Sequence, residues 1–394
     1  MTSENAFAAA RRDFPALEHS TYLDVSARGI LSRSVRSAID WQLDDATQHG
    51  GRKALWLTQL EATREKFAQL VHAEPDEIAF TKNVSEGLNI IAAGLPWRSG
   101  DNVVVAAEAE HPNNVYPWLN LRRHGVTMKI VPTRDGEIVA ADVLEAIDPH
   151  TRLVAVASQT FSPGLRTDLD AIGAQCRARD IFLLVDGAQS VGILDTDVGR
   201  SAIDGLAVST SKGLLGLYGM GFLYCRRAWA ERIEPAYLAR FSVEIEDGHE
   251  ADMGDFSYRL AAGARRFDLG NYNFPAAYAA NASLERLLGL STPAIERHVG
   301  ALARRLADGL AQLGLPVYGH GRREALGSIV CVGRLSAGHD TTGDRRMAAL
   351  YEHLAAHHVR LSIRRGVLRF SLHLYNAPED VDRVLALVSE APLP

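Results

Sequence analysis

Cysteine is scarce in this chain, and long apolar runs are missing. Its 394 residues include three cysteines, Cys176, Cys225 and Cys331, which lie far apart and form no C-x-x-C pair. Neither a zinc site nor a disulfide framework is therefore indicated. No stretch approaches the roughly 20 apolar residues of a membrane span, and the first residues lack the apolar core of a signal peptide. We expect a cytoplasmic protein in a reducing compartment, with residues 1–20 forming an N-terminal arm.

Positive charge is not in excess either. The formal net charge is -6 at pH 7, and no long run of lysine or arginine is present, whereas nucleic-acid binding needs clustered basic residues. The composition is otherwise that of an ordinary globular protein, 47% hydrophobic and 23% charged. We therefore expect a small-molecule partner, and neither nucleic acid nor a membrane.

Short apolar runs alternate with helical patterns in the first two thirds of the chain. A helical pattern such as 169–180 lies between predicted strands, and a parallel crossover needs a connection of that size. This alternation predicts an α/β domain over residues 21–275, with a mostly parallel sheet covered by helices on both faces. Long helical patterns and a few strands after that point predict a smaller α+β domain over 276–394. The strands expected in the first domain are 102–107, 152–158, 181–186, 205–209 and 221–225.

Two ionisable residues follow neighbouring predicted strands. Asp186 ends the apolar run "IFLLVD", and Lys212 follows the next strand. Ligands of open parallel sheets bind at the carboxyl ends of the strands. A partly desolvated lysine forms a Schiff base with an aldehyde, and pyridoxal phosphate pairs such a lysine with an acid at its pyridine nitrogen. The alternatives are structural: Asp186 as a turn cap or an arginine partner, and Lys212 as a solvated lysine.

A phosphate site is predicted where "FTKNVSEGLNIIAAGL" passes from a strand into a helix. Backbone N–H groups at a helix start and nearby hydroxyls bind phosphate. Asn83, Val84 and Ser85 form the turn, although Ser85 could instead be an N-cap. Ser209 and Ser211 flank Lys212 and add hydroxyl groups.

Six motifs, in order, carry a resemblance to a known family: "FTKNVSEGLN", "EHPNNVYPW", "VDGAQSVG", "STSKGLLGLYGMGFLY", "RRFDLGNYN" and "LRFSLHLYN". They resemble the landmark motifs of the class V aminotransferases among the fold-type I pyridoxal-phosphate enzymes. The family includes cysteine desulfurases, selenocysteine lyases, kynureninases and isopenicillin N epimerase-like proteins. The match runs from about Tyr22 to the C-terminal helix. It implies a seven-stranded-type sheet, pyridoxal 5'-phosphate and a homodimer with shared active sites.

The resemblance also implies a role for each cofactor contact. Lys212 would hold the cofactor and act as catalytic base, while Asp186 would pair with the pyridine nitrogen. His111 would stack on the ring as a second catalytic residue, unless it is a solvated loop histidine. Gln189 would bond the ring hydroxyl, with Gln159 near the same group. The phosphate would be held by Val84, Ser85 and Ser209, and by Asn271 of the neighbouring subunit.

Arginines match the family's substrate contacts. Arg369 corresponds to the residue that takes the substrate carboxylate, for which a planar guanidinium is suited. Arg364 is a second candidate, with adjacent Arg365 leaving the register open by one position. For both arginines the alternative is a structural salt bridge.

Further polar residues could shape the substrate pocket, and each has a structural alternative. Ser26 and Arg28 lie in "YLDVSARGIL", where Arg28 could be a surface turn residue. Tyr218 could cover a subunit interface, and His373 could be a satisfied strand histidine. The acidic segment 240–259 is not assigned.

Two departures from the desulfurase branch guide the expected reaction. Ser211 stands where that branch has histidine before the lysine, and no reactive cysteine lies between the two arginine segments. Buried cysteines are usually inert. We therefore expect an enzyme acting at the α-carbon of an amino acid, an aminotransferase or a related lyase or epimerase, and not a persulfide-forming desulfurase. The alternatives are a C–S lyase like the cysteine desulfurases and selenocysteine lyases, or a non-catalytic cofactor-binding module.

Overall fold

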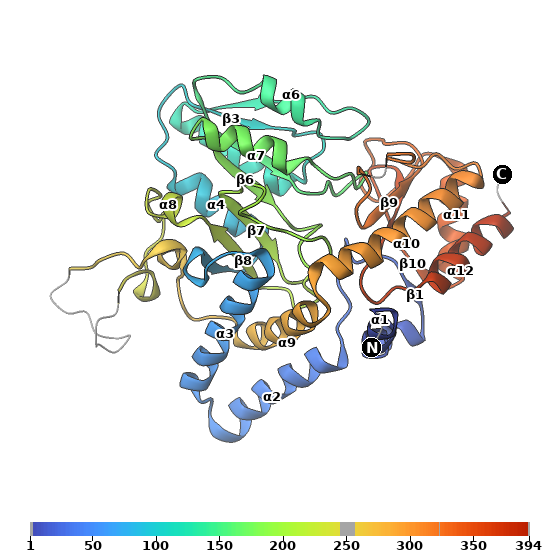
Figure 1. Ribbon diagram of the computed structural model, residues 1–394, viewed down its shortest axis with the longest axis horizontal. Helices are drawn as coiled ribbons and strands as arrows, with labels where there is room; N and C mark the ends of the chain where they lie inside the picture. Colours follow the sequence, from blue (N-terminus) through green and yellow to red (C-terminus); the bar gives the residue numbers. More distant parts are fainter. Residues whose placement is uncertain (1–2, 245–256, 323, 393–394) are drawn as a thin grey trace.

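A seven-stranded sheet forms the centre of the molecule (Figure 1). The computed structural model describes residues 3–244, 257–322 and 324–392. The strand order is β2-β8-β7-β6-β5-β3-β4, and β8 runs antiparallel to both of its neighbours while the other pairs are parallel. The predicted mostly parallel sheet is confirmed. Its strands are β2 (Ile78–Thr81), β3 (Asn102–Val105), β4 (Thr127–Ile130), β5 (Thr151–Ala157), β6 (Phe182–Asp186), β7 (Gly205–Ser209) and β8 (Gly221–Cys225).

Both faces of this sheet are buried, which explains why its inner strands are apolar without alternation. Successive residues of β6 enter different cores: Leu183 and Val185 pack on one side, and Phe182 and Leu184 on the other. The second core is completed by α4 (Val84–Gly94), α5 (Tyr116–Asn120) and α8 (Arg227–Ala230), and the first by α3 (Lys53–Val71), α7 (Leu169–Ala178), α9 (Phe274–Leu290) and α10 (Thr292–Gln312).

The C-terminal part is built on a three-stranded antiparallel sheet in the order β11-β12-β9. The helices α10, α11 and α12 pack around it (Figure 1). This arrangement agrees with the α+β pattern read from the sequence. The elements are β9 (Ile329–Val332), α11 (Arg345–Ala356), β10 (Val359–Arg360), β11 (Ser362–Arg364), β12 (Val367–Ser371) and α12 (Pro378–Glu390).

The N-terminal segment lies against this C-terminal part of its own chain. Helix α1 (Ser3–Arg11) places Phe7 on the ring of His298, with centroids 4.1 Å apart, and Arg11 pairs with Asp380. Strand β1 (Thr21–Tyr22) then pairs in parallel with β10. The segment after β1 consequently reaches the site from the C-terminal part.

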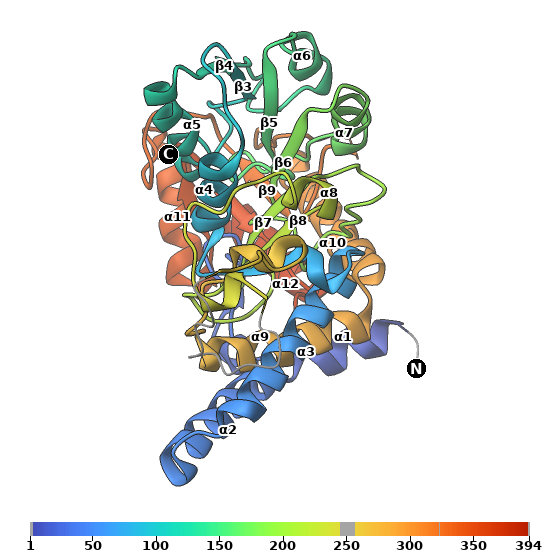
Figure 2. The same cartoon turned by 90° about the vertical axis from the view of Figure 1, so that its left-hand side faces the viewer.

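Helix α2 (Arg33–His49) projects from the body of the molecule (Figure 2). It contacts α9, where Trp41 stacks on Tyr278 with ring centroids 5.3 Å apart. Within the described ranges, no helix is long and apolar enough to cross a bilayer. Residues 245–256 of the unassigned acidic segment lie outside the described residues. The remaining elements are α6 (Ala140–Glu145), η1 (Pro15–Glu18), η2 (Pro75–Glu77), η3 (Pro112–Asn114), η4 (Leu121–His124), η5 (Arg240–Ser242) and η6 (Gly263–Phe267).

Candidate active site

A cavity of about 280 Å³ lies at the carboxyl ends of β6 and β7 and at the first turn of α4. This is the edge where ligands of open parallel sheets bind. Most residues predicted for the cofactor lie together here. The lining consists of Asn83, Val84, Ser85, His111, Asn113, Ala157, Gln159, Phe161, Asp186, Ala188, Gln189, Ser209, Ser211, Lys212 and Tyr218.

Asp186 and Lys212 lie in this cavity as an interacting pair. The Asp186 carboxylate accepts a hydrogen bond from the Ala188 N–H at 2.9 Å. Burial raises the pKa of Asp186, whereas the charge of Lys212 lowers it. Burial also lowers the pKa of Lys212 to about 8, against the opposing effect of Asp186. A lysine in this state supplies the neutral amine that attacks an aldehyde.

The first turn of α4 lines the cavity through Asn83, Val84 and Ser85. Asn83 is the N-cap and accepts a bond from the Glu86 N–H at 3.0 Å, so Ser85 is not the cap. The Ser85 hydroxyl, one residue into the helix, lines the cavity instead. Ser209 and Ser211 face the same space, with their hydroxyl oxygens 3.0 Å apart. N–H groups at a helix start together with hydroxyls form an anion site.

His111 is a neutral imidazole at the wall of the cavity. Burial, followed by the charge of Lys212, lowers the pKa of His111 to about 4. Its Nδ1 accepts a bond from the Asn113 N–H at 3.2 Å, and its ring meets the edge of Phe161 with centroids 5.4 Å apart. The ring is thereby oriented before any ligand is present.

The two glutamines differ in the polar atoms they leave available. Gln159 is fully buried, and its amide donates to the Gly164 carbonyl at 2.8 Å and accepts from the Ser328 hydroxyl at 3.1 Å. Gln189 also lines the cavity, but its Oε1 is buried and has no partner among the described residues. A ligand hydroxyl at this position would satisfy that oxygen, because buried polar atoms require hydrogen bonds.

The predicted substrate arginines come from β11 and β12. Arg369 is 2% exposed and donates to the Ser362 hydroxyl at 3.1 Å and the Phe161 carbonyl at 3.0 Å. Its Nη2 lies 3.8 Å from Asp24. Burial lowers the pKa of Arg369 to about 10, and Asp24 opposes that effect.

Of the two adjacent arginines, Arg364 and not Arg365 acts electrostatically on Lys212. Its charge lowers the pKa of Lys212, and its Nη1 pairs with Asp340 at 2.5 Å. The neighbouring Arg365 is turned to the Glu108 carbonyl at 2.6 Å. Arg364 is therefore the arginine of the two that we carry forward as a substrate contact.

Of the residues predicted for the substrate, only Tyr218 is part of the cavity lining; Ser26, Arg28 and His373, like the two arginines, are not. Ser26 is buried and its N–H donates to the Ser371 hydroxyl at 2.9 Å, while Arg28 is exposed. His373 is fully buried, and its Nε2 lies 2.8 Å from the Gly213 carbonyl. Burial lowers the pKa of His373 to about 4. It supports the backbone that follows Lys212, which matches its structural alternative.

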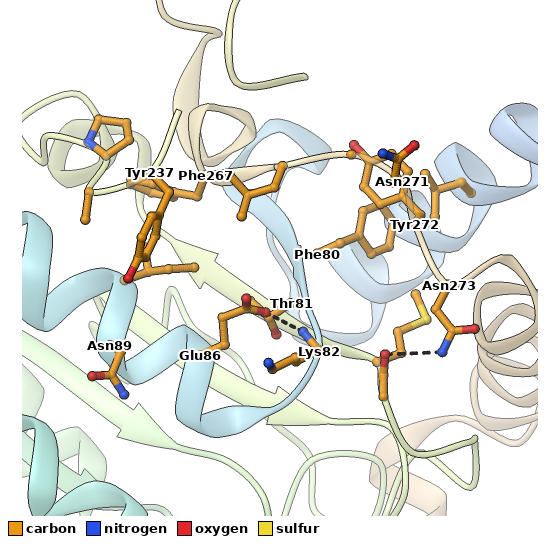
Figure 3. A pocket seen from close by; sticks show the side chains of 18 residues that line it. Phe80, Thr81, Lys82, Glu86, Asn89, Tyr237, Phe267, Asn271, Tyr272 and Asn273 are labelled. Atoms are coloured by element: carbon orange, nitrogen blue, oxygen red, sulfur yellow. Dashed lines mark hydrogen bonds between the residues drawn. The ribbon is translucent and has the colours of Figure 1, made fainter. Parts of the chain in front are cut away.

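Asn271 lies at a second cavity of about 310 Å³, shown in Figure 3 with Thr81, Lys82 and Asn273 around it. Lys82 lines this cavity, and the next residue, Asn83, lines the first one. The loop before Asn271 is fixed by Asp268, which accepts from the buried Arg64 at 2.7 Å and from the Phe80 N–H at 2.9 Å. Asn271 is exposed and is absent from the lining of its own chain's first cavity.

Sequence reasoning missed two acids at the site. Asp24 pairs with Arg369, and Glu110 is a buried carboxylate that accepts from the Ala157 N–H at 2.6 Å and the Asn114 amide at 2.8 Å. Burial, with Asp186 as a further cause, raises the pKa of Glu110 to about 8. Its position directly before His111 was the available signal, but nothing in the sequence distinguished it from a surface glutamate.

The cavity fits pyridoxal phosphate. The orphaned Gln189 oxygen matches a ring hydroxyl, Asp186 offers a carboxylate oxygen, the α4 turn offers donors for a phosphate, and Lys212 offers an amine of lowered pKa. When bound, this cofactor acts as an electron sink for bonds to the α-carbon of an amino acid.

Comparison with known proteins defines the class first. An apo structure of a cysteine desulfurase from Thermococcus onnurineus NA1 has a TM-score of 0.83, with 26% identity over 96% of each chain. The family model for Aminotransferase class-V matches residues 21–384. The fold is that of the fold-type I pyridoxal-phosphate enzymes. The chain belongs to the class V aminotransferase family, as its motifs predicted, and is a pyridoxal-phosphate-dependent enzyme.

Two curated relatives narrow the comparison. A "Probable cysteine desulfurase" of Methanothermobacter thermautotrophicus is 31% identical, with 94% of each chain covered. A second protein of that name, from Pyrococcus abyssi, is 30% identical with 96% of each chain covered.

These relatives overturn the reaction expected from the sequence. The preference for an aminotransferase or a related lyase or epimerase over a persulfide-forming desulfurase is wrong, because both relatives are named as probable cysteine desulfurases and match nearly the whole chain. The error was to treat the lack of a loop cysteine as evidence against the entire class. The first alternative, a C–S lyase like the cysteine desulfurases, fits better.

Proposed function

We propose that this protein is a pyridoxal-phosphate-dependent C–S lyase that removes sulfur from cysteine or a closely related β-thio amino acid. The observation that carries the proposal is the 31% identity to a protein named as a probable cysteine desulfurase over 94% of the chain. The combination of Lys212, Asp186 and Arg369 around one site supports it, because this set suits an amino acid held by its amine and its carboxylate.

In this proposal Lys212 would bind the cofactor aldehyde and would later move the α-proton of the substrate. Its lowered pKa suits it to exchange a proton near neutral pH. Asp186 would keep the pyridine nitrogen protonated, and Gln189 would accept from the ring hydroxyl. The neutral ring of His111 would contact the cofactor, which a charged imidazole beside Lys212 would do less well.

The proposed phosphate site is the first turn of α4 with the hydroxyls of Ser85, Ser209 and Ser211. The helix N-terminus and these donors stabilise a dianion. Gln159 would have a supporting role at the cavity wall, because both ends of its amide are already bonded.

Arg369 is the proposed partner of the substrate carboxylate, and Arg364 its neighbour. The guanidinium of Arg369 is held by Ser362 and Phe161, so its orientation is fixed before the substrate arrives. Asp24 and Asp340 balance the two charges until then. Tyr218, 65% exposed at the cavity edge, is a proposed substrate contact.

We also keep the homodimer with shared sites as part of the proposal. Asn271 is exposed beside the first turn of α4 but does not line its own cavity. A position of this kind suits contact with the phosphate of a second copy. The division into an arm over 1–20, a large domain over 21–275 and a small domain over 276–394, and the cytoplasmic location, likewise remain proposals.

The test is to incubate the reconstituted protein with L-cysteine and a reducing thiol, and to measure alanine, pyruvate and released sulfur. We expect sulfur release that Lys212→Ala abolishes together with the visible band of the bound cofactor. Asn271→Ala mixed with Lys212→Ala should regain part of the activity if one chain completes the site of the other. A coloured protein that binds cysteine but releases no sulfur would refute the proposed function.

A further inference from the structure

Removing sulfur from cysteine to leave alanine requires a thiol that accepts the sulfur. A thiolate attacks the substrate sulfur, the Cβ–S bond breaks, and its electron pair remains with Cβ, which takes a proton. The balance is cysteine plus R–SH giving alanine plus R–S–SH. Without an acceptor thiol, sulfur can leave only by elimination, and the carbon product is then pyruvate.

None of the three cysteines offers such a thiol, and all three lie within the described residues. Cys176 in α7, Cys225 at the end of β8 and Cys331 in β9 each have no exposed surface. Burial raises the pKa of Cys176 and of Cys331 to about 12, and that of Cys225 well above its usual range. A reactive cysteine needs an accessible thiolate.

Cys331 lies opposite Arg369 in the β9–β12 pair, which makes it the cysteine nearest in the sheet to a predicted substrate residue. Its side chain packs with Ile329 and Val367 in a small apolar cluster and is absent from the cavity lining. A second copy of the chain cannot supply the thiol either. A cysteine already buried within its own chain stays buried when two copies associate.

The cavity is open to a thiol that arrives from solution. Its edge is open at Asn113 and Tyr218, which are exposed. A small thiol can therefore reach the cavity through this edge, whereas the three buried thiols of the chain cannot.

We propose that the sulfur acceptor is a low-molecular-weight thiol supplied in trans, which binds at this open edge and leaves as a persulfide. This inference rests on the proposed C–S lyase function. It reconciles relatives named as desulfurases with a chain whose own thiols are all buried.

The test is a single turnover of the holoenzyme with less than one equivalent of L-cysteine per site, so that the substrate cannot serve as its own acceptor. The added probe is 2-mercaptoethanol. We expect alanine formation to rise at least about tenfold and to saturate with the probe, because single-turnover rates isolate the chemical step. Alkylation should recover the sulfur as mercaptoethanol persulfide.

Matched variants test whether a cysteine of the protein itself accepts the sulfur. Cys331→Ala, Cys176→Ala and the variant lacking all three cysteines should each keep the thiol-dependent rate within about twofold, because inert buried cysteines contribute only packing. If the triple variant fails to fold, mass spectrometry of the wild-type protein after turnover without added thiol gives the same answer. A sulfur adduct on any of the three cysteines would overturn the inference.

Two further outcomes separate this inference from the proposed function. Pyruvate and sulfide formed at a rate independent of the probe would overturn the proposal of a small-thiol acceptor, while the proposed C–S lyase function would still hold. No alanine, pyruvate or sulfide under any condition, from enzyme that binds cysteine, would overturn both.

Discussion

The lowered pKa of Lys212 leads to a quantitative prediction for cofactor binding. Only the neutral amine attacks the cofactor aldehyde. With its pKa at about 8, about 9% of Lys212 is neutral at pH 7, against about 0.03% for an ordinary lysine. The apoenzyme should therefore react with pyridoxal phosphate about 300-fold faster at pH 7 than an amine of ordinary pKa held in the same place.

The assay follows the visible band of the bound cofactor as the apoenzyme is mixed with pyridoxal phosphate between pH 6 and 10. The rate should rise about tenfold per pH unit and level off near pH 8, because the neutral fraction saturates above the pKa. Dividing by the rate for N-α-acetyl-lysine under the same conditions, expressed per neutral amine, removes the ionisation of the cofactor itself.

Two variants test in which direction each neighbouring charge shifts the pKa of Lys212. Asp186 raises the pKa of Lys212, so Asp186→Asn should move the levelling-off point to lower pH. Arg369 lowers the pKa of Lys212, so Arg369→Met should move it to higher pH. A levelling-off point near 10.5 in the wild type, or an upward movement in Asp186→Asn, would refute the reasoning.

Three other predictions concern binding and stability. Arg369→Ala should weaken amino-acid binding about 100-fold or more, because two charge-assisted hydrogen bonds to the substrate carboxylate are lost. Titration of the cofactor band measures this affinity, and Arg369→Lys should recover part of it. Equal affinities of Arg369→Ala and the wild type would contradict the carboxylate assignment. The raised pKa of Glu110 means that the folded apoenzyme binds an extra proton between about pH 4.5 and 8. Its free energy of unfolding should therefore fall as pH rises through that interval, by up to about 1.4 kcal/mol per pH unit. Denaturant unfolding of Glu110→Gln should lack this pH dependence, and an unchanged pH dependence in the variant would contradict the assignment to Glu110. His373 has a lowered pKa, so stability should be lost as pH falls from about 6.5 towards 4; His373→Gln should remove that loss, and a wild type without it would show that the histidine is not buried in its neutral form.

The sequence by itself determined the sheet and most of the cavity. Parallel strands covered on both faces are apolar throughout, so the strands ending at Asp186 and Ser209 could be predicted from the sequence. Their carboxyl ends meet at one edge, which placed Asp186 and Lys212 together. Strand β4 was not among the predicted strands, because its four residues are partly exposed and lack an apolar pattern.

Only the tertiary structure decided which polar residues face the cavity. His373 turns to the Gly213 carbonyl, and Gln159 lines the cavity with both ends of its amide already bonded. The charge of Arg364 acts on Lys212, whereas Arg365 turns to the Glu108 carbonyl. Strand sequence does not encode those choices. Asp24 and Glu110 became part of the site because β1 pairs with β10 and the loop after β3 packs on β5. Such contacts join residues hundreds or tens of positions apart, and their energies depend on burial, which exists only once the chain has folded.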